Sequence, residues 1–178
     1  MRPEAFPESI RPHLVPEPSG ELIYRCLGCG ATYGIQRLLY TCPDCGSVLL
    51  LVDPDFQRLQ ALSGEDWHRI FDYRKMLNIS ALKGIYRFHE FIGPVIPLDA
   101  VVYLGEGATP IVEANDILAE KVGLRFYFKN DGQNPSASLK DEGMASALSY
   151  IHFLIRSGAL SEVLAVCAST GDTSAAAA

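Results

Sequence analysis

The sequence predicts an α/β fold, in which a partial parallel sheet with flanking helices follows a small zinc ribbon. Two CxxC pairs within residues 21–52 indicate the ribbon. Apolar runs in residues 125–178 follow the order strand, helix, strand and helix start, which is typical of a βαβ unit. Two or three parallel strands do not complete a doubly wound sheet. We therefore expect the sequence to be the N-terminal part of a longer, truncated domain.

The composition is that of a folded protein with an ordinary core. The chain has 178 residues, is 48% hydrophobic and carries a formal net charge of −6. This acidic balance argues against nonspecific binding to nucleic acid or to an anionic membrane. The N-terminus is rich in Pro and Glu and resembles no signal peptide, and no apolar run reaches the roughly 18 residues of a membrane span. We therefore expect a cytoplasmic protein, in which disulfides are rare.

Four segments are expected along the chain. Residues 1–20 form an irregular N-terminal arm, because five prolines disfavour regular structure there. Residues 21–52 form the ribbon. Residues 53–95 form a helical connecting segment, and residues 96–178 form the N-terminal portion of an incomplete α/β domain.

Four cysteines of the ribbon have the spacing C-x2-C-x12-C-x2-C. They are Cys26, Cys29, Cys42 and Cys45. Two thiolates three residues apart on a tight turn can face one tetrahedral zinc ion, and the glycines that follow, Gly30 and Gly46, can adopt positive φ. Four thiolates leave no open coordination position, so the Zn2+ would be structural. Two disulfides or two redox pairs are the alternatives.

The ribbon does not have the charge of a nucleic-acid-binding module. Zinc ribbons often bind nucleic acid, but residues before the closing strand hold two arginines against two acidic residues. These are Arg25 and Arg37 against Glu21 and Asp44. Such a balance is a poor footprint for binding phosphates.

Short elements are expected before the long helix. Residues 92–114 read as loop and short strand, because Gly and Pro interrupt them. Asn115 or Asp116 can begin a short helix that ends at Gly123. Residues 125–129 are rich in aromatic side chains and are predicted to form a strand.

A long helix is predicted over residues 138–157. Ser138 is suited to its N-cap, and Gly158 is a stop signal. The apolar run 162–168 is of the type found in buried strands, and Cys167 within it would be a small core residue. We expect 125–129 and 162–168 to pair in parallel, with the helix crossing over right-handed.

Lys140 lies in the first turn of this helix, where the positive end of the helix dipole disfavours a cation. Either its side chain extends into solvent, or the site uses a lysine that is easily deprotonated. Two further stretches bear on the choice, "LGEGATPI" at 104–111 and "STGDTSAA" at 169–176. The second leaves a predicted strand and enters a helix, so its free N–H groups can hold an anion such as a carboxylate. None of these stretches is specific alone.

Together, in this order, the stretches resemble the threonine synthases, pyridoxal-phosphate enzymes of fold type II in the tryptophan-synthase-β superfamily. In that family an EGxTP segment precedes an "NP-S/T-x-S-F-K-D" motif, and an "S-T/S-G-N/D-T" loop follows. Many members begin with a four-cysteine zinc ribbon. The resemblance covers residues 21–178 and is weakest over the helical stretch 54–95.

The resemblance implies a role for each motif residue. Lys140 would be the catalytic lysine, joined to pyridoxal 5'-phosphate as a Schiff base. Burial and the helix dipole would favour its neutral amine, which a Schiff base needs. Asp172 would lie near the cofactor's 3-hydroxyl. The substrate carboxylate would be held by Ser169, Thr170 and Thr173.

Two positions depart from the family pattern. Leu139 stands where Phe is common, and Glu142 stands where Arg is frequent. Glu142 reverses a charge in the first turn of the lysine helix. Neither residue touches the reacting groups of the implied chemistry.

The resemblance implies a lyase of threonine biosynthesis that converts O-phospho-L-homoserine and water to L-threonine and phosphate by β,γ-replacement. A cysteate synthase, a threonine dehydratase and a non-catalytic zinc-ribbon interaction fragment are the alternatives. The expected partner is the small-molecule substrate, and binding to nucleic acid or to a membrane is not expected. Whether the protein forms a homodimer is left open. The family's phosphate loop and its partner for the pyridine nitrogen come later than residue 178, so we expect this chain alone to be inactive.

Overall fold

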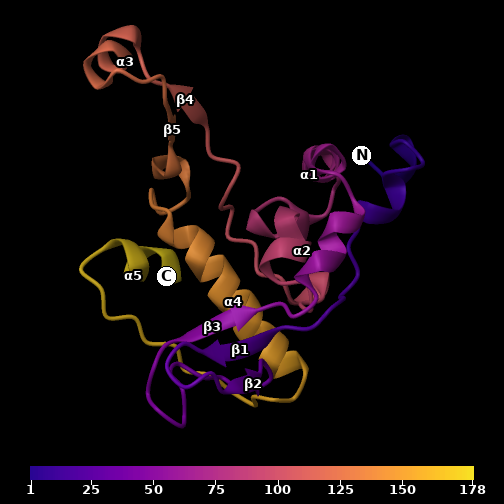
Figure 1. Ribbon diagram of the computed structural model, residues 1–178, viewed down its shortest axis with the longest axis vertical. Helices are drawn as coiled ribbons and strands as arrows, with labels where there is room; N and C mark the ends of the chain where they lie inside the picture. The colour runs from indigo at the N-terminus through magenta and orange to yellow at the C-terminus, as the bar shows by residue number, and fades with distance from the viewer.

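The computed structural model describes residues 1–178 and shows a body of helices with one small sheet, from which an arm projects (Figure 1). The helices are α1 (Gly64–Met76), α2 (His89–Ile92), α3 (Asp116–Val122), α4 (Lys140–Arg156) and α5 (Asp172–Ala177). The strands are β1 (Ile23–Cys26), β2 (Thr32–Gly34), β3 (Leu49–Val52), β4 (Ile111–Glu113) and β5 (Tyr127–Lys129). Short 3-10 turns connect them. The predicted α/β class with a four-cysteine ribbon is confirmed, and no helix has the length and apolarity to cross a bilayer.

The ribbon is an antiparallel sheet of order β2-β1-β3 that lies beside α4. Tyr24, at the centre of β1, pairs with Tyr33 of β2 and Leu51 of β3. Its hydroxyl donates to the Tyr150 hydroxyl of α4 at 2.8 Å, and Tyr150 in turn lies 2.5 Å from the Ile35 carbonyl. The sheet is therefore fixed to the middle of α4 through polar contacts.

The N-terminal arm is irregular as predicted, but it is packed. Two short 3-10 turns, Pro3–Ala5 and Arg11–His13, place apolar side chains against α1. The buried residues of this cluster are Phe6, Ile10, Leu14, Ile70, Leu77 and Leu82. Because the arm supplies three of these six, it forms part of the core of the helical segment.

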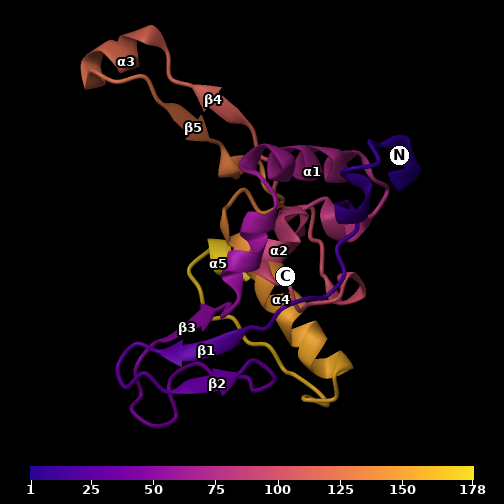
Figure 2. The ribbon, with the colours of Figure 1, turned by 45° about the vertical axis from the view of Figure 1, so that its right-hand side comes forward.

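Within residues 53–95, the part after α1 consists mainly of 3-10 turns around the short helix α2. A second buried cluster of Tyr86, Ile96 and Ala100 packs against Tyr150 and Phe153 of α4. This contact joins the helical segment to the same helix that supports the ribbon. In Figure 2, α4 accordingly lies next to both the ribbon strands and the helical segment that contains α2.

The arm that projects from the body contains β4, α3 and β5 (Figures 1 and 2). The predicted helix after Asn115 is present, since the Asn115 side chain accepts from the Leu118 amide at 2.9 Å and Gly123 closes the helix at φ 73°. The two strands pair antiparallel, with Val112 opposite Phe128.

The predicted parallel pairing of residues 125–129 with 162–168 is wrong for this structure. β5 pairs with β4 alone, and 162–168 is irregular chain. Leu164 is 89% exposed, and Cys167 is exposed rather than a buried core residue. Strands of parallel sheets are stable when neighbouring strands pair with them and helices cover both faces. Here no element covers 162–168, so its apolar composition alone does not make it a strand.

Candidate functional site

The four ribbon cysteines converge on one point. Their sulfur atoms all lie within 4.8 Å of one another. The Cys26 and Cys45 sulfurs are 3.4 Å apart, and those of Cys29 and Cys42 are 3.7 Å apart. Zn–S bonds of about 2.3 Å in a tetrahedron require sulfurs roughly 3.8 Å apart. The four thiols therefore fit a single tetrahedral metal ion after small adjustments.

Each CxxC pair is shaped by the same backbone turn. The Gly30 amide donates to the Cys26 carbonyl at 3.1 Å, and the Gly46 amide donates to the Cys42 carbonyl at 2.9 Å. Both glycines have the positive φ that the sequence predicted, 78° and 73°. The Cys29 amide also points at the Cys26 sulfur, 3.4 Å away. Such N–H groups stabilise negative charge on sulfur, as a metal-binding thiolate requires.

Neighbouring side chains also act on the thiols. Hydrogen bonds from Ser47 lower the pKa of Cys45 to about 6. The Tyr33 hydroxyl, 3.1 Å from the Cys42 sulfur, lowers the pKa of Cys42. For Cys29 a backbone hydrogen bond at Ala31 lowers the pKa, but bonds with the other thiols and desolvation together raise it to about 12. The cluster thus holds thiolates and thiols side by side when no metal neutralises them.

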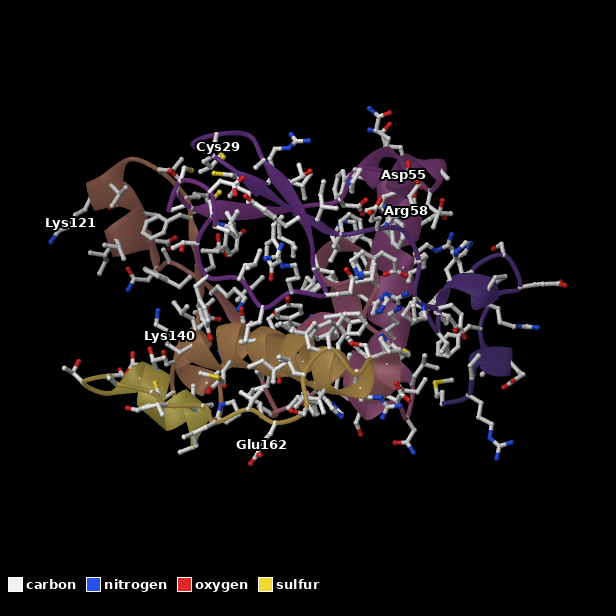
Figure 3. All side chains as sticks on the ribbon, turned by 90° about the horizontal axis from the view of Figure 1, so that it is seen from below. Cys29, Asp55, Arg58, Lys121, Lys140 and Glu162 are labelled. Atoms are coloured by element: carbon white, nitrogen blue, oxygen red, sulfur yellow. The ribbon has the colours of Figure 1, made fainter.

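Lys140 is the first residue of α4, two residues later than the predicted start. The prediction of Ser138 as the N-cap is wrong, because Leu139 occupies that position; the Ser138 hydroxyl instead accepts from the Lys140 amide at 3.2 Å. Asp141, whose side chain is buried, accepts from the Ser136 amide at 2.8 Å and holds the preceding turn. The Lys140 side chain itself is exposed (Figure 3), and the expected burial around it is absent.

The loop 169–173 lies next to this helix start. Ser138 donates to the Asp172 carboxylate at 3.2 Å, which links the first turns of α4 and α5. Ser169 and Thr170 are exposed, and Thr173 is half-buried. The structure therefore brings the Lys140 segment and the Asp172 loop together, although α5 begins without a strand before it.

Two buried polar residues tie the Gly-rich stretch to its neighbours, Glu106 to the segment at Ile85 and Asn134 to the lysine segment, and sequence reasoning did not single them out. Glu106 is 1% exposed and accepts from the amides of Leu104 and Ile85 at 2.9 and 3.1 Å. Asn134 accepts from the Gly107 amide at 2.9 Å. Both belong to stretches noted in the sequence, so their position within a motif was the available signal.

Polar atoms without partners lie just before Lys140. The amide nitrogen of Asn134 and the hydroxyl of Ser136 are buried and form no hydrogen bond. Buried polar groups are normally paired, so these two atoms fit a site that receives a polar group from elsewhere. Together with the primary amine of Lys140, they suit a polar aldehyde cofactor such as pyridoxal phosphate.

Glu142, the charge reversal in the first turn of α4, has a partner. Its carboxylate lies 3.1 Å from the Lys129 ammonium of β5. Lys129 also bonds to Thr109 and to Asp131. The negative charge at this position is therefore compensated by a cation from the strand that precedes the lysine motif.

The comparisons with known proteins agree with the site. Residues 102–178 match the family described as "Pyridoxal-phosphate dependent enzyme". These residues include the Gly-rich stretch, Lys140 and the Asp172 loop. This part of the chain is therefore similar to pyridoxal-phosphate-dependent enzymes.

Curated relatives narrow this class. The chain is 32% identical to a threonine synthase of Methanocaldococcus jannaschii over 155 residues, which are 86% of this chain and 33% of that protein. It is 30% identical to the threonine synthase of Methanosarcina acetivorans over 159 residues, 85% of this chain and 32% of that protein. It is 32% identical to threonine synthase 2, chloroplastic, of Arabidopsis thaliana over 153 residues, which are 82% of this chain and 28% of that protein.

Residues 102–178 thus match the pyridoxal-phosphate-dependent enzyme family, and most of the chain is similar to part of the threonine synthases. The chain spans about a third of the length of the curated relatives that it matches.

Proposed function

We propose that these residues supply the lysine-bearing part of a threonine synthase, which converts O-phospho-L-homoserine and water to L-threonine and phosphate by β,γ-replacement. The observation that carries the proposal is the contact between the starts of α4 and α5, through Ser138 and Asp172 at 3.2 Å. This contact supports the proposal that the two motif segments form a single site. Similarity to threonine synthases over most of the chain supports the choice of reaction.

Lys140 would hold the cofactor through its amine. Its exposed side chain starts from a helix turn that Ser138 and Asp141 fix from both sides. The same amine would carry protons to and from the substrate's carbon atoms. Pyridoxal phosphate, when bound, supplies the electron sink for this chemistry.

The loop beside Lys140 would orient the substrate. The hydroxyls of Ser169, Thr170 and Thr173 would donate to the substrate carboxylate, and Asp172 would lie near the cofactor's 3-hydroxyl. Asp172 is already held by the Ser138 hydroxyl. The unpartnered amide nitrogen of Asn134 would be a further donor in the lysine segment.

We also propose that the four cysteines bind one structural Zn2+. Protein purified without metal-affinity resin should contain about one zinc per chain by elemental analysis, because four thiolates form a closed site. Cys42→Ser should lose the zinc and unfold residues 21–52. Cys167→Ser is the matched control, since Cys167 lies outside the cluster and should not alter zinc content. Equal zinc in both variants would contradict the assignment.

The test for Lys140 uses a protein that spans the full length of the relatives and contains these residues. After addition of pyridoxal phosphate and reduction with borohydride, peptide mapping should find the label on Lys140. Lys140→Ala should abolish both the label and phosphate release from O-phospho-L-homoserine. Lys121→Ala, on the projecting arm (Figure 3), should leave both unchanged. Stable labelling of a different lysine would refute the assignment.

A further inference from the structure

The helical segment contains two buried arginines with opposite surroundings. Arg74 is fully buried and fully partnered, because it donates to Glu90 and to three backbone carbonyls. Arg87, 8% exposed, forms no hydrogen bond or ion pair through its side chain, and its Nε and Nη1 atoms are buried without partners. An uncompensated buried charge is strongly unfavourable, so an anion that forms hydrogen bonds with the Arg87 guanidinium would be bound with a large gain in free energy.

Arg87 lines a cavity of about 580 Å³. The cavity lies between the segment after α1 and the two motif stretches that lead to Lys140, and Gly107, Thr109 and Glu142 form part of its wall. Phe88 forms another part, and its ring centre is 4.9 Å from the Arg87 guanidinium carbon. This contact orients the guanidinium plane but leaves its N–H groups free.

The charges around the cavity favour an anion. Three cationic side chains line it, Lys75, Arg87 and Lys129, against the single carboxylate of Glu142. Glu142 is paired with Lys129, and Lys75 is paired with Asp72 at 2.7 Å. Arg87 alone has no counter-charge in contact. Lys129 also bonds to Asp131, so the two lysines are neutralised by their own partners and the cation left without a contacting carboxylate at the cavity is Arg87.

We infer that Arg87 anchors a binding site for a phosphate-type oxyanion in this cavity. The N–H groups on one edge of a guanidinium, Nη2 with either Nε or Nη1, form the planar fork that binds phosphate or carboxylate oxygens through two parallel hydrogen bonds. The cavity is much larger than a phosphate ion, so a phosphate monoester also fits. The inference rests on Arg87 and its cavity and holds whether or not the proposed reaction is correct.

The test measures binding of inorganic phosphate to the chain by titration calorimetry, with a phosphate monoester, O-phospho-L-serine, as the second arm. Arg87→Met should weaken phosphate binding at least about tenfold, because a hydrogen bond to a charged group contributes about 1.5–3 kcal/mol. Arg69→Met is the matched control, since Arg69 is exposed on α1 and should leave binding unchanged. Tighter binding of the monoester would identify an ester as the natural ligand, and equal binding would identify the free ion.

A second measurement separates lost binding from lost folding. In phosphate-free buffer Arg87→Met should unfold at a urea midpoint no lower than that of the parent chain, because the variant removes an unpaired buried charge. Added phosphate should raise the midpoint of the parent chain and not that of the variant. No binding of either phosphate compound, or equal binding by the parent and Arg87→Met, would overturn the inference.

Discussion

Replacing Arg74 by Met should strongly destabilise the helical segment. The guanidinium lies at the centre of this segment and forms five hydrogen bonds. Two go to the Glu90 carboxylate, at 2.5 and 2.8 Å. Three go to the carbonyls of His13, Leu14 and Arg87. One side chain thus joins α1 to the N-terminal arm and to α2.

The size of the effect follows from what the substitution leaves behind. Glu90 has a side chain only 14% exposed, and it would lose its cation. Breaking a buried ion pair by removing one partner costs about 3–5 kcal/mol. Met fills a similar volume, so little of this loss comes from a cavity. With a urea dependence of about 2 kcal/mol per M, the midpoint of unfolding should fall by about 1.5–2.5 M.

The assay is urea unfolding followed by the fluorescence of Trp67, the single tryptophan of the chain. Trp67 lies on α1 and stacks on Phe71, so its emission reports on the helical segment. Arg69→Met, an exposed change on the same helix, should shift the free energy of unfolding by less than about 0.5 kcal/mol.

A double variant tests the cause. Adding Glu90→Gln to Arg74→Met removes the unpaired carboxylate and should recover part of the lost stability, because the uncompensated charge is then gone. The reasoning is refuted if Arg74→Met costs less than about 1 kcal/mol, or if the double variant is no more stable than Arg74→Met alone.

Two further predictions concern buried groups of the same region. Burial lowers the pKa of His89 below its ordinary value of about 6.5, so stability is lost as the pH falls from that value toward the folded-state pKa. Between pH 7.5 and 5.5 the midpoint of urea unfolding should therefore fall by the equivalent of about 1 kcal/mol. His89→Gln should reduce this drop, whereas His68→Gln, on the exposed side of α1, should not. Gly84→Ala should cost about 1–3 kcal/mol in the same assay, because its Cβ would lie 2.6 Å from the Glu106 carboxyl carbon. Gly143→Ala should instead stabilise by about 0.5–1 kcal/mol, because this residue lies within α4 and its added Cβ would meet open space. Equal effects of the two substitutions would contradict the clash at Gly84.

The sequence was most informative where local signals act within a few residues. The predicted helix over 138–157 is α4, Lys140–Arg156, and its stop at Gly158 has the expected positive φ of 75°. The helix after Asn115 has its expected cap. Caps and left-handed glycines are set by neighbouring residues, so they can be read without knowledge of the fold.

Pairing over long distances could not be read in the same way. The strand at 127–129 was expected, but its partner is β4 in antiparallel orientation rather than 162–168. An apolar run becomes a strand only when other strands pair with it and a layer covers it. Leu164 and Val166 are 89% and 84% exposed because no such layer lies over them.

The burial of charged residues could not be predicted from the sequence either. The local sequence does not distinguish Arg74, Arg87 and Glu106 from other residues of helical or Gly-rich stretches, so it does not predict that they are buried. Partners of Arg74 and Glu106 include residues distant in the chain, His13 for Arg74 and Ile85 for Glu106. Long polar side chains usually lie at the surface, so composition favours the opposite interpretation.

The position of the ribbon against α4 gives the cysteine cluster a consequence for the lysine site. The Tyr150 hydroxyl of α4 accepts from Tyr24 at 2.8 Å and reaches the Ile35 carbonyl at 2.5 Å, and burial raises the pKa of Tyr150 so that it stays a donor. β1, which carries Tyr24, ends at Cys26 of the cluster. A metal that holds Cys26 and its partners would therefore also hold the strand that supports α4. Because Lys140 begins that same helix, the ribbon contributes to the placement of the lysine without touching the chemistry.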